Sequence, residues 1–480
     1  MKFGDGRFIV VVIAVLLAGC AVGPDYGRPP LTPPEKFRGQ VTPVEAASMA
    51  DLPWWEVFGD TTLQALIKEA IAGNYDLQVA TARVAQARAQ AGVAQAAFFP
   101  WIGYNVKVQR AKEYAAFLGI SNTNNQFVPS ATNLFLGALS ASWEIDVWGA
   151  VRRSNEAATA QLLATEEGRR GVLLSLVADV AQAYFELIEL DALLQIAKET
   201  TATYEGIYRI FKDRLEFGVE SQLEVARAEG ALFSAAANIP ELQSQIAAKE
   251  NQISTLLGKN PSAIPRGTTL FSQEVPSTVP AGLPSALLER RPDVMKLEEQ
   301  LVAANANIGV AKAQFFPQLN LTGILGKASP ELTLLTNGTS TIWAIAAALT
   351  GPIFQGGRIL ENYRGTVALW DEAKLQYEQG VIKAFQDVAS NLVALDQLAG
   401  AETELTRAVA ALKKAVELAE LRYLYGLSSY YEVLDAEEKL FPAQNAQAQV
   451  RLNRLVAYVQ LYKALGGGWN VQNPQSAARQ

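Results

Sequence analysis

Cys20 is the one side chain in this sequence whose type and position predict a defined chemical modification. It is the only cysteine among 480 residues, and it follows small residues at the end of an apolar stretch from Phe8 to Leu17. That stretch is too short to remain as a membrane-spanning helix, and cations precede it. We therefore expect residues 1–19 to be a bacterial lipoprotein signal peptide and Cys20 to carry the acyl chains of the mature protein.

A plain secretory signal with an incidental cysteine is the alternative for this segment. Ala21 follows the cysteine, whereas an aspartate at that position commonly keeps bacterial lipoproteins in the inner membrane. The sequence therefore favours the outer membrane. The proline-rich residues 20–60 are expected to form an extended, lipid-linked segment, and residues 470–480 a loose tail.

The rest of the composition excludes most catalytic chemistry. No histidine occurs in the chain, and the thiol of Cys20, the single cysteine, is expected to be bonded to lipid. Zinc sites, histidine-based triads and disulfides are therefore not expected. The net charge of −7, which becomes −8 when Lys2, Asp5 and Arg7 leave with the signal, argues against nucleic acid as a partner. We expect no catalytic residue, no cofactor and no metal site.

The chain repeats itself. Residues 92–100 (GVAQAAFFP) recur as residues 309–317 (GVAKAQFFP), and residues 217–225 (FGVESQLEV) recur as residues 425–433 (YGLSSYYEV). The offset is 217 positions for the first match and 208 for the second. Two such matches in the same order indicate that each half of the chain is one structural unit, which needs the other half to bury its faces.

Each repeat is predicted to contain a helix, a β-hairpin, a long helix, a tight turn and a further helix. The first repeat occupies residues 61–260 with its hairpin at 101–147, and the second occupies residues 292–469 with its hairpin at 318–353. Residues 261–291 link the two. Both hairpins alternate apolar and polar residues over about ten positions per strand, with aromatic residues near the ends, as membrane strands do.

The helices are expected to be unusually long. Asp60 or Thr61 can cap a first helix that runs to Ala97. Residues 130–239 contain no proline, so residues 152–217 can form one rod of about 65 residues, roughly 100 Å long. Apolar residues recur along it every seven positions, as a helix–helix seam requires: they are Leu173, Val180, Leu187 and Leu194.

An ordinary long coiled coil is the alternative interpretation of these helices. After the signal no apolar run approaches the length of a membrane helix, so if the chain crosses a membrane it must do so by strands. Four strands cannot close a barrel, because about eight are needed and open edges in lipid leave backbone groups unpaired. Several chains must therefore share one barrel, and counting strands does not choose among two, three or four copies.

Four short motifs, taken together, carry a resemblance to a known family. They are residues 20–26 (CAVGPDY), Trp54-Trp55 with Phe58 and Asp60, residues 288–294 (LERRPDV) and residues 304–313 (ANANIGVAKA). With them the chain resembles the outer-membrane efflux factor family of the TolC type, in its OprM-like and NodT-like lipoprotein branch of tripartite RND efflux systems. The likeness covers nearly the whole mature chain.

The resemblance implies a mainly α-helical protein with membrane β-strands. Three copies would form a twelve-stranded outer-membrane β-barrel continuous with a long periplasmic α-helical barrel. The inner end would meet a periplasmic adaptor protein and an inner-membrane RND-type pump, and the channel would passively conduct drugs or other small solutes. The alternative function is a lipid-anchored structural or adhesive coiled-coil protein without a pore.

The two tight turns would form the periplasmic tip of such a channel. Gly218 and Gly426 suit a helix-to-helix reversal, because glycine accepts a positive φ angle at little cost. Arg214 and Arg422 lie four residues before these glycines and resemble the family's adaptor-docking arginines. The alternative is that both arginines only complement the C-termini of their helices.

The family closes its tunnel near the same tip with carboxylates and bulky side chains, and Tyr423, Tyr431 and Asp435 match that pattern. Glu438 stands where the resemblance predicts an arginine. Arg227 occupies the position of Asp435 in the other repeat and could supply the missing cation. The alternative is that Asp435 and Glu438 form only a solvated acidic helix face.

Overall fold

The structure is a computed structural model. It describes residues 21–40, 48–111, 132–275, 279–336 and 338–467. The expected signal peptide, Cys20 and the tail after residue 470 lie outside these ranges. The described chain divides into two compact units: residues up to 29, 85–164 and 298–376 make the first, and residues 30–84, 165–297 and from 377 onward make the second.

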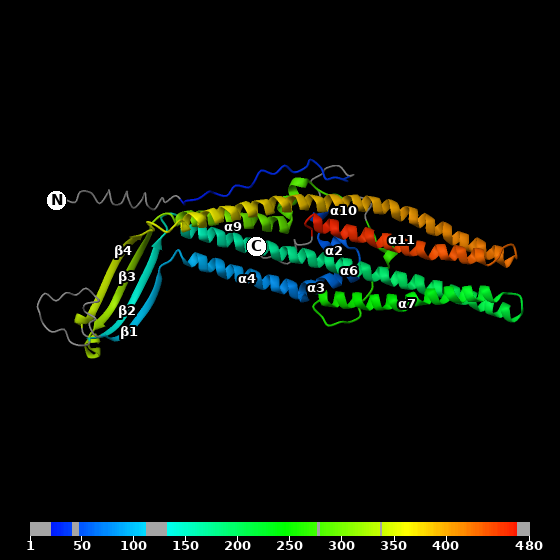
Figure 1. Ribbon diagram of the computed structural model, residues 1–480, viewed down its shortest axis with the longest axis horizontal. Helices are drawn as coiled ribbons and strands as arrows, with labels where there is room; N and C mark the ends of the chain where they lie inside the picture. The colour runs from blue at the N-terminus through cyan, green and yellow to red at the C-terminus, as the bar shows by residue number, and fades with distance from the viewer. Residues whose placement is uncertain (1–20, 41–47, 112–131, 276–278, 337, 468–480) are drawn as a thin grey trace. The chain divides into compact units, whose positions relative to one another are not determined.

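The first unit contains a single antiparallel sheet of four strands in the order β1-β2-β3-β4 (Figure 1). The strands are β1 (Trp101–Ala111), β2 (Thr132–Ile145), β3 (Gln318–Ser329) and β4 (Thr341–Thr350). Each repeat therefore supplies one hairpin, and β2 and β3 join the two hairpins through their own ladder. The prediction of four strands per chain is confirmed.

The register of the sheet lines up apolar side chains across all four strands. Tyr104 is opposite Leu139, Leu139 is opposite Leu325, and Leu325 is opposite Trp343. Because alternate residues of a strand point to opposite faces, such rows place the apolar positions on one face. That face is exposed within the chain: Tyr104 retains 82 % of its accessible surface.

The helices make up most of the remaining chain. They are α2 (Trp54–Val57), α3 (Thr61–Gly73), α4 (Tyr75–Ala96), α6 (Ala150–Glu216), α7 (Gln222–Leu256), α8 (Leu287–Arg290), α9 (Pro292–Ala313), α10 (Arg358–Leu424) and α11 (Tyr431–Ala464). Short 3-10 turns lie at Met49–Asp51, Leu270–Ser272, Pro284–Ala286, Leu332–Thr336 and Gly338–Ser340. The predicted long helices are confirmed, since α6 and α10 each contain 67 residues.

The prediction of one helix from Asp60 to Ala97 is wrong, because the chain breaks between α3 and α4 at Asn74. Asn74 has extended backbone angles. Its side chain accepts a hydrogen bond from the Leu77 amide and donates one to the Leu256 carbonyl. An asparagine that caps the following turn competes with continued helix.

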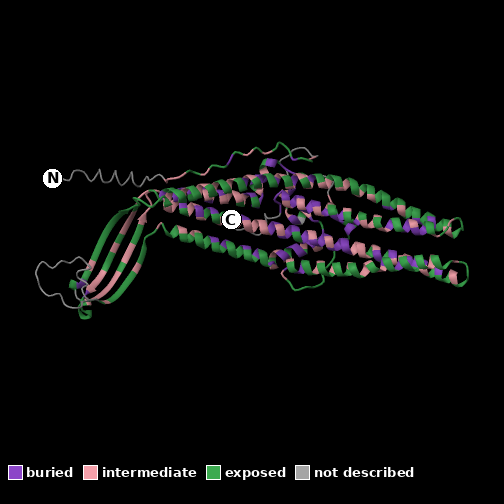
Figure 2. Ribbon diagram, in the orientation of Figure 1, coloured by how far each residue is buried: buried purple, intermediate pink, exposed green. Residues whose placement is uncertain are grey.

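The predicted seam of α6 is buried at three of its four positions, and Leu194 is half-buried. Leu173, Val180 and Leu187 are buried, as are the adjacent Val177 and Tyr184, and buried residues run along this part of α6 in Figure 2. Among the described helices, α6 alone has an 18-residue window apolar enough to cross a membrane, with a mean hydropathy of 1.5. Because 67 % of that window is buried inside the protein, packing between helices accounts for its apolar character.

Asp60 organises the core of the second unit. Its carboxylate caps α3 at the amides of Thr62 and Leu63 and also accepts hydrogen bonds from the Tyr184 hydroxyl and the Gln273 side chain. Burial raises the pKa of Asp60, but these hydrogen bonds outweigh burial and lower it below its ordinary value. The Asp60 carboxylate therefore has a structural role: its hydrogen bonds join the linker residue Gln273 to α3 and α6.

Arg291 is the corresponding structural residue of the second repeat, because its side chain joins several elements. It forms ion pairs with Asp293 at 2.7 Å and with Asp387 of α10 at 3.0 Å. It also donates to the carbonyl of Ala464 at the end of α11. The Arg-Arg-Pro-Asp motif therefore fastens the start of α9 to α10 and α11.

Candidate gate and docking site at the helix reversals

The reversals that join α6 to α7 and α10 to α11 lie at the same end of the second unit (Figure 1). Gly218 and Gly426 have φ angles of 74° and 70°. In the first reversal the amides of Gly218 and Val219 bond back to the carbonyls of Leu215 and Arg214, and the second repeats this pattern. This is the Schellman arrangement, in which the left-handed residue favours glycine.

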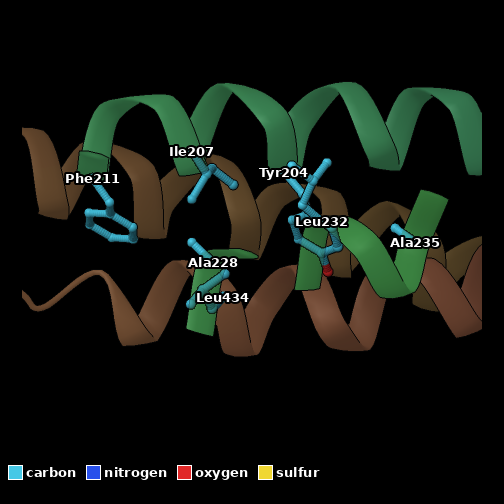
Figure 3. Close-up of a cluster of buried hydrophobic side chains, with 7 residues drawn as sticks. All are labelled: Tyr204, Ile207, Phe211, Ala228, Leu232, Ala235 and Leu434. Carbon is cyan, nitrogen blue, oxygen red and sulfur yellow. The ribbon is translucent and has the colours of Figure 1, made fainter. Parts of the chain in front are cut away.

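A cluster of buried apolar side chains lies behind the first reversal (Figure 3). It joins three helices: Tyr204, Ile207 and Phe211 come from α6, Ala228, Leu232 and Ala235 from α7, and Leu434 from α11. α6 and α7 have therefore buried apolar stripes against each other, and Leu434 ties α11 to the same cluster.

Arg214 and Tyr423 are in direct contact, although Arg214 was predicted to dock the adaptor and Tyr423 to close the gate. Arg214 Nη1 donates to the Tyr423 hydroxyl, and its guanidinium lies 5.4 Å from the centre of the Tyr423 ring. Arg214 also lies 3.8 Å from the Glu220 carboxylate. The predicted docking arginine of the first reversal is thus engaged with a predicted gate residue of the second.

Arg422 is placed differently. It forms an ion pair at 3.3 Å with Glu432, which lies in its own hairpin, and its side chain is exposed. The two arginines at equivalent repeat positions therefore differ: Arg214 contacts the other hairpin, whereas the described ion pair of Arg422 lies within its own hairpin.

Tyr430 is a site residue that sequence reasoning missed. Its ring meets Phe211 edge-on at 4.6 Å and Tyr423 edge-on at 4.9 Å between ring centres. Burial, followed by the charges of Glu437 and Glu420, raises the pKa of Tyr430. The adjacent Tyr430 and Tyr431 at the start of α11 do not show in the sequence which of the two rings is buried.

The three remaining predicted gate residues and Glu438 line one pocket of about 540 Å³ between α6, α7 and α11. Arg227, Tyr431, Asp435 and Glu438 all contribute to its wall. The charges are nevertheless paired locally: Arg227 lies 3.2 Å from Glu224, and Asp435 lies 2.6 Å from Lys439. The structure thus brings the predicted residues together around one opening without an ion pair between Arg227 and Asp435 among its described contacts.

The exposed tips of both reversals are apolar. Phe217 and Tyr425, at equivalent repeat positions, retain 82 % and 78 % of their accessible surface. Val219 and Leu427 follow the glycines and are also exposed. Exposed apolar side chains grouped at the end of a helix pair are typical of a surface that binds another protein.

Together, a four-stranded sheet with an apolar exposed face and open edges, and helix pairs with reversals of this kind, define a channel subunit of the outer membrane. The family model described as outer membrane efflux protein matches residues 66–259 and 283–467. The cation efflux system protein CusC of Escherichia coli is 35 % identical over 466 residues, which cover 96 % of this chain and 99 % of CusC.

A probable efflux pump outer membrane protein of Pseudomonas putida, TtgC, is 34 % identical over 97 % of this chain and 96 % of its own length. Among solved structures, the open state of the Neisseria gonorrhoeae MtrE outer membrane channel superposes with a TM-score of 0.84 at 32 % identity, covering 94 % of this chain and 99 % of MtrE. The chain belongs to the outer membrane efflux protein family. It has the fold of the TolC-type channels and is an outer-membrane channel component of an efflux system.

Proposed function

We propose that three copies of this chain form a conduit that carries drugs or other small solutes through the periplasm and across the outer membrane. The observation that carries the proposal is the sheet: its apolar face is exposed, and β1 and β4 each have only one neighbouring strand. In lipid the unpaired edges of those strands need partners, because each unsatisfied backbone group costs several kcal/mol there. Three such sheets joined edge to edge supply twelve strands and leave no free edge.

The amino-terminal segment supports anchoring of the mature chain by lipid at Cys20. Residues 21–29 lie extended along helices of the first unit, where Asp25 forms an ion pair at 2.6 Å with Arg153. Arg28 binds both carboxylate oxygens of Glu298. A lipid on Cys20 would therefore be held beside this unit by a chain that is already fastened to it. The structural repeats are proposed to span residues 61–260 and 292–469, as the sequence predicts.

The reversals are the proposed gate. In a trimer Tyr423, Tyr431 and Asp435 would each be present three times around the axis, and Arg227 lines the same pocket as Asp435. A ring of carboxylates attracts cations and disfavours anions. The contact between Arg214 and Tyr423 links the two hairpins, so it would have to break if one hairpin moves away from the other.

The exposed tips are the proposed docking surface for a periplasmic adaptor protein that couples the conduit to an inner-membrane RND-type pump. Gly218 and Gly426 shape the two turns, and Arg422 offers an exposed cation beside apolar side chains. No catalytic reaction is proposed, and within the described residues no group of three or more potential metal ligands occurs.

The test is to purify the mature protein in detergent and measure its assembly and its conductance in planar bilayers. The conduit predicts a trimer and discrete conductance steps. A lipid-anchored adhesive protein without a pore predicts no conductance. A monomer that stays water-soluble after removal of its acyl groups would overturn the proposal.

A further inference from the structure

Glu189 of α6 is a buried carboxylate that the gate and the docking surface do not use. It retains 4 % of its accessible surface, and its Oε1 atom has no hydrogen-bond partner. Leaving a buried charged oxygen unpaired is costly, so such a group calls for an explanation. Gln397 of α10, at the equivalent position of the other repeat, is exposed, so the repeat architecture does not require a buried acid here.

Glu189 lines a pocket of about 380 Å³ between α6, α7 and α11. Asn445 of α11 lines the same pocket, and its Oδ1 atom is buried and also lacks a partner. Gln245 donates one amide hydrogen to Glu241 and Gln449 donates one to Asn453, and no described hydrogen bond satisfies the two buried oxygens. The pocket therefore presents vacant acceptors, which a ligand with N–H donors and positive charge would satisfy.

The charged residues around the pocket do not pair with the vacant oxygens of Glu189 and Asn445. Glu186, one turn before Glu189, accepts from Gln182 and forms an ion pair with Lys249 of α7 at 2.6 Å. Glu241 adds a second carboxylate to the pocket wall, whereas α11 contributes only neutral residues to it. Lys249 is thus committed to Glu186, and the lining residues of the pocket include two carboxylates and no cation.

Apolar residues complete the wall. Leu193, Leu242 and Phe441 line the pocket, and Phe441 also lines the neighbouring pocket that holds Asp435. The lining holds two carboxylates and no histidine or cysteine, and no group of three or more such metal ligands occurs among the described residues. An apolar body with a cationic head matches the lining better, and the aromatic ring can contact the head.

We propose that Glu189 and Asn445 form the polar floor of a binding site for a small protonated organic amine. The ammonium group donates to the two vacant oxygens, Glu241 contributes long-range attraction, and the apolar part of the amine contacts Leu193 and Phe441. The site lies in the helical part of the chain and would hold amines inside the protein, apart from the residues assigned to the gate.

The direct test is calorimetric titration of the purified protein in detergent at pH 8 with 2-phenylethylammonium. The expected result is one site per chain, with binding at least tenfold weaker for the neutral analogue 2-phenylethanol. Glu189→Gln is expected to weaken amine binding at least tenfold, because it removes the charge and keeps the shape. Glu404→Gln, which changes an exposed carboxylate of α10 paired with Arg407, is the matched control and should leave binding unchanged.

Ala446→Phe provides a second variant, because Ala446 lines the pocket and carries no polar side chain. The larger ring should fill the pocket and abolish amine binding while Glu189 stays in place. Burial, followed by the charge of Glu186, raises the pKa of Glu189 to about 7, so binding should also weaken as the pH falls from 8 to 6. Circular dichroism confirms that each variant is folded.

Three outcomes overturn the site: no amine binding by the folded wild-type protein, equal binding by Glu189→Gln, or binding of Ca²⁺ or Mg²⁺ alone where the amine fails. Conductance recorded on the same preparation separates this proposal from the conduit. Intact channels without amine binding refute only the site, and amine binding without channels refutes only the conduit.

Discussion

The two helix reversals have the same backbone and different side-chain contacts. Gly218 and Gly426 share a positive φ angle and the same pattern of backbone hydrogen bonds. Arg214, however, reaches from the first hairpin to Tyr423 of the second, whereas Arg422 pairs with Glu432 inside its own hairpin. The repeat thus sets the shape of each turn, and single side chains decide which hairpin holds the other.

The long helices α6 and α10 also share a backbone and differ in the side chains at equivalent positions. Glu189 of α6 is buried and Gln397 of α10, its repeat counterpart, is exposed. The first repeat therefore carries the buried charge and the contact between hairpins, and the second carries the exposed carboxylate Asp435. Variants made in equivalent pairs can test whether these differences have the assigned effects.

The largest expected effect is on stability and comes from Glu189→Gln. The folded-state pKa of Glu189 is raised to about 7 from 4.5 in a free side chain. Below pH 4.5 Glu189 is protonated in both the folded and the unfolded state. Between pH 4.5 and 7 it ionises in the unfolded state before it ionises in the folded state, so the free energy of unfolding falls as the pH rises. A difference of this size corresponds to about 3 kcal/mol. The variant should therefore melt well above the wild type at pH 8, and the two should melt together at pH 4.

The measurement is thermal melting followed by helical circular dichroism, without added amine. Gln397→Glu, which places a carboxylate at an exposed position, should change the melting temperature little at either pH. An equal shift for Glu189→Gln at pH 4 and pH 8 would show that Glu189 is not held by burial.

The next effect concerns the turns. Gly218→Ala and Gly426→Ala should each destabilise the protein by about 1–2 kcal/mol, because alanine is strained at positive φ. An added Cβ would meet no atom within 4 Å at either position, so the penalty is confined to the backbone. The two losses should be similar, because the φ angles of 74° and 70° are close.

Gly206→Ala is the control for the turn variants. Gly206 lies inside α6 with open space around it, so alanine should stabilise the helix by about 0.5–1 kcal/mol. Melting of all three variants tests the comparison, and it fails if the turn variants match this control.

Arg214→Ala and Arg422→Ala should separate the contact between hairpins from the contact within one. Arg214→Ala removes the hydrogen bond to Tyr423, which for a half-exposed pair we set at about 1 kcal/mol, or a fivefold shift from the closed to the open state. Arg422→Ala leaves that link intact and should change opening by less than twofold. Single-channel open probability is the measurement, and similar values for both variants would contradict the assignment.

The long helices, the hairpins and the cap at Asp60 could be predicted because their signals are local. Strand alternation, heptad spacing and a capping side chain depend on neighbouring residues. The break at Asn74 was missed although Gly73-Asn74 is a local helix-stop signal, and the Asn74 side chain is fixed in addition by Leu256, more than 180 positions away. Contacts of this kind become visible only when the chain has folded.

The candidate site divides in the same way. The glycines of the reversals follow from the repeat, and their positions were predicted. Tyr430 and Glu189 were not, because an aromatic ring beside another tyrosine or an acid in a long helix looks like a surface residue in the sequence. Only the packing of Phe211 and Tyr423 around Tyr430, and of three helices around Glu189, gives them a role.

The smallest expected effect is on ion preference, through the opposite charges at the repeat-equivalent positions Arg227 and Asp435. Both line one pocket, and both are partly neutralised, by Glu224 and Lys439. Because local pairing and solvent weaken each charge, Asp435→Asn should lower the cation-to-anion permeability ratio by only about twofold, and Arg227→Gln should raise it by a similar factor. Reversal potentials in a salt gradient measure both. Changes of the same sign would mean that the two side chains do not face one ion path, and the pocket would then have to be separated from the gate.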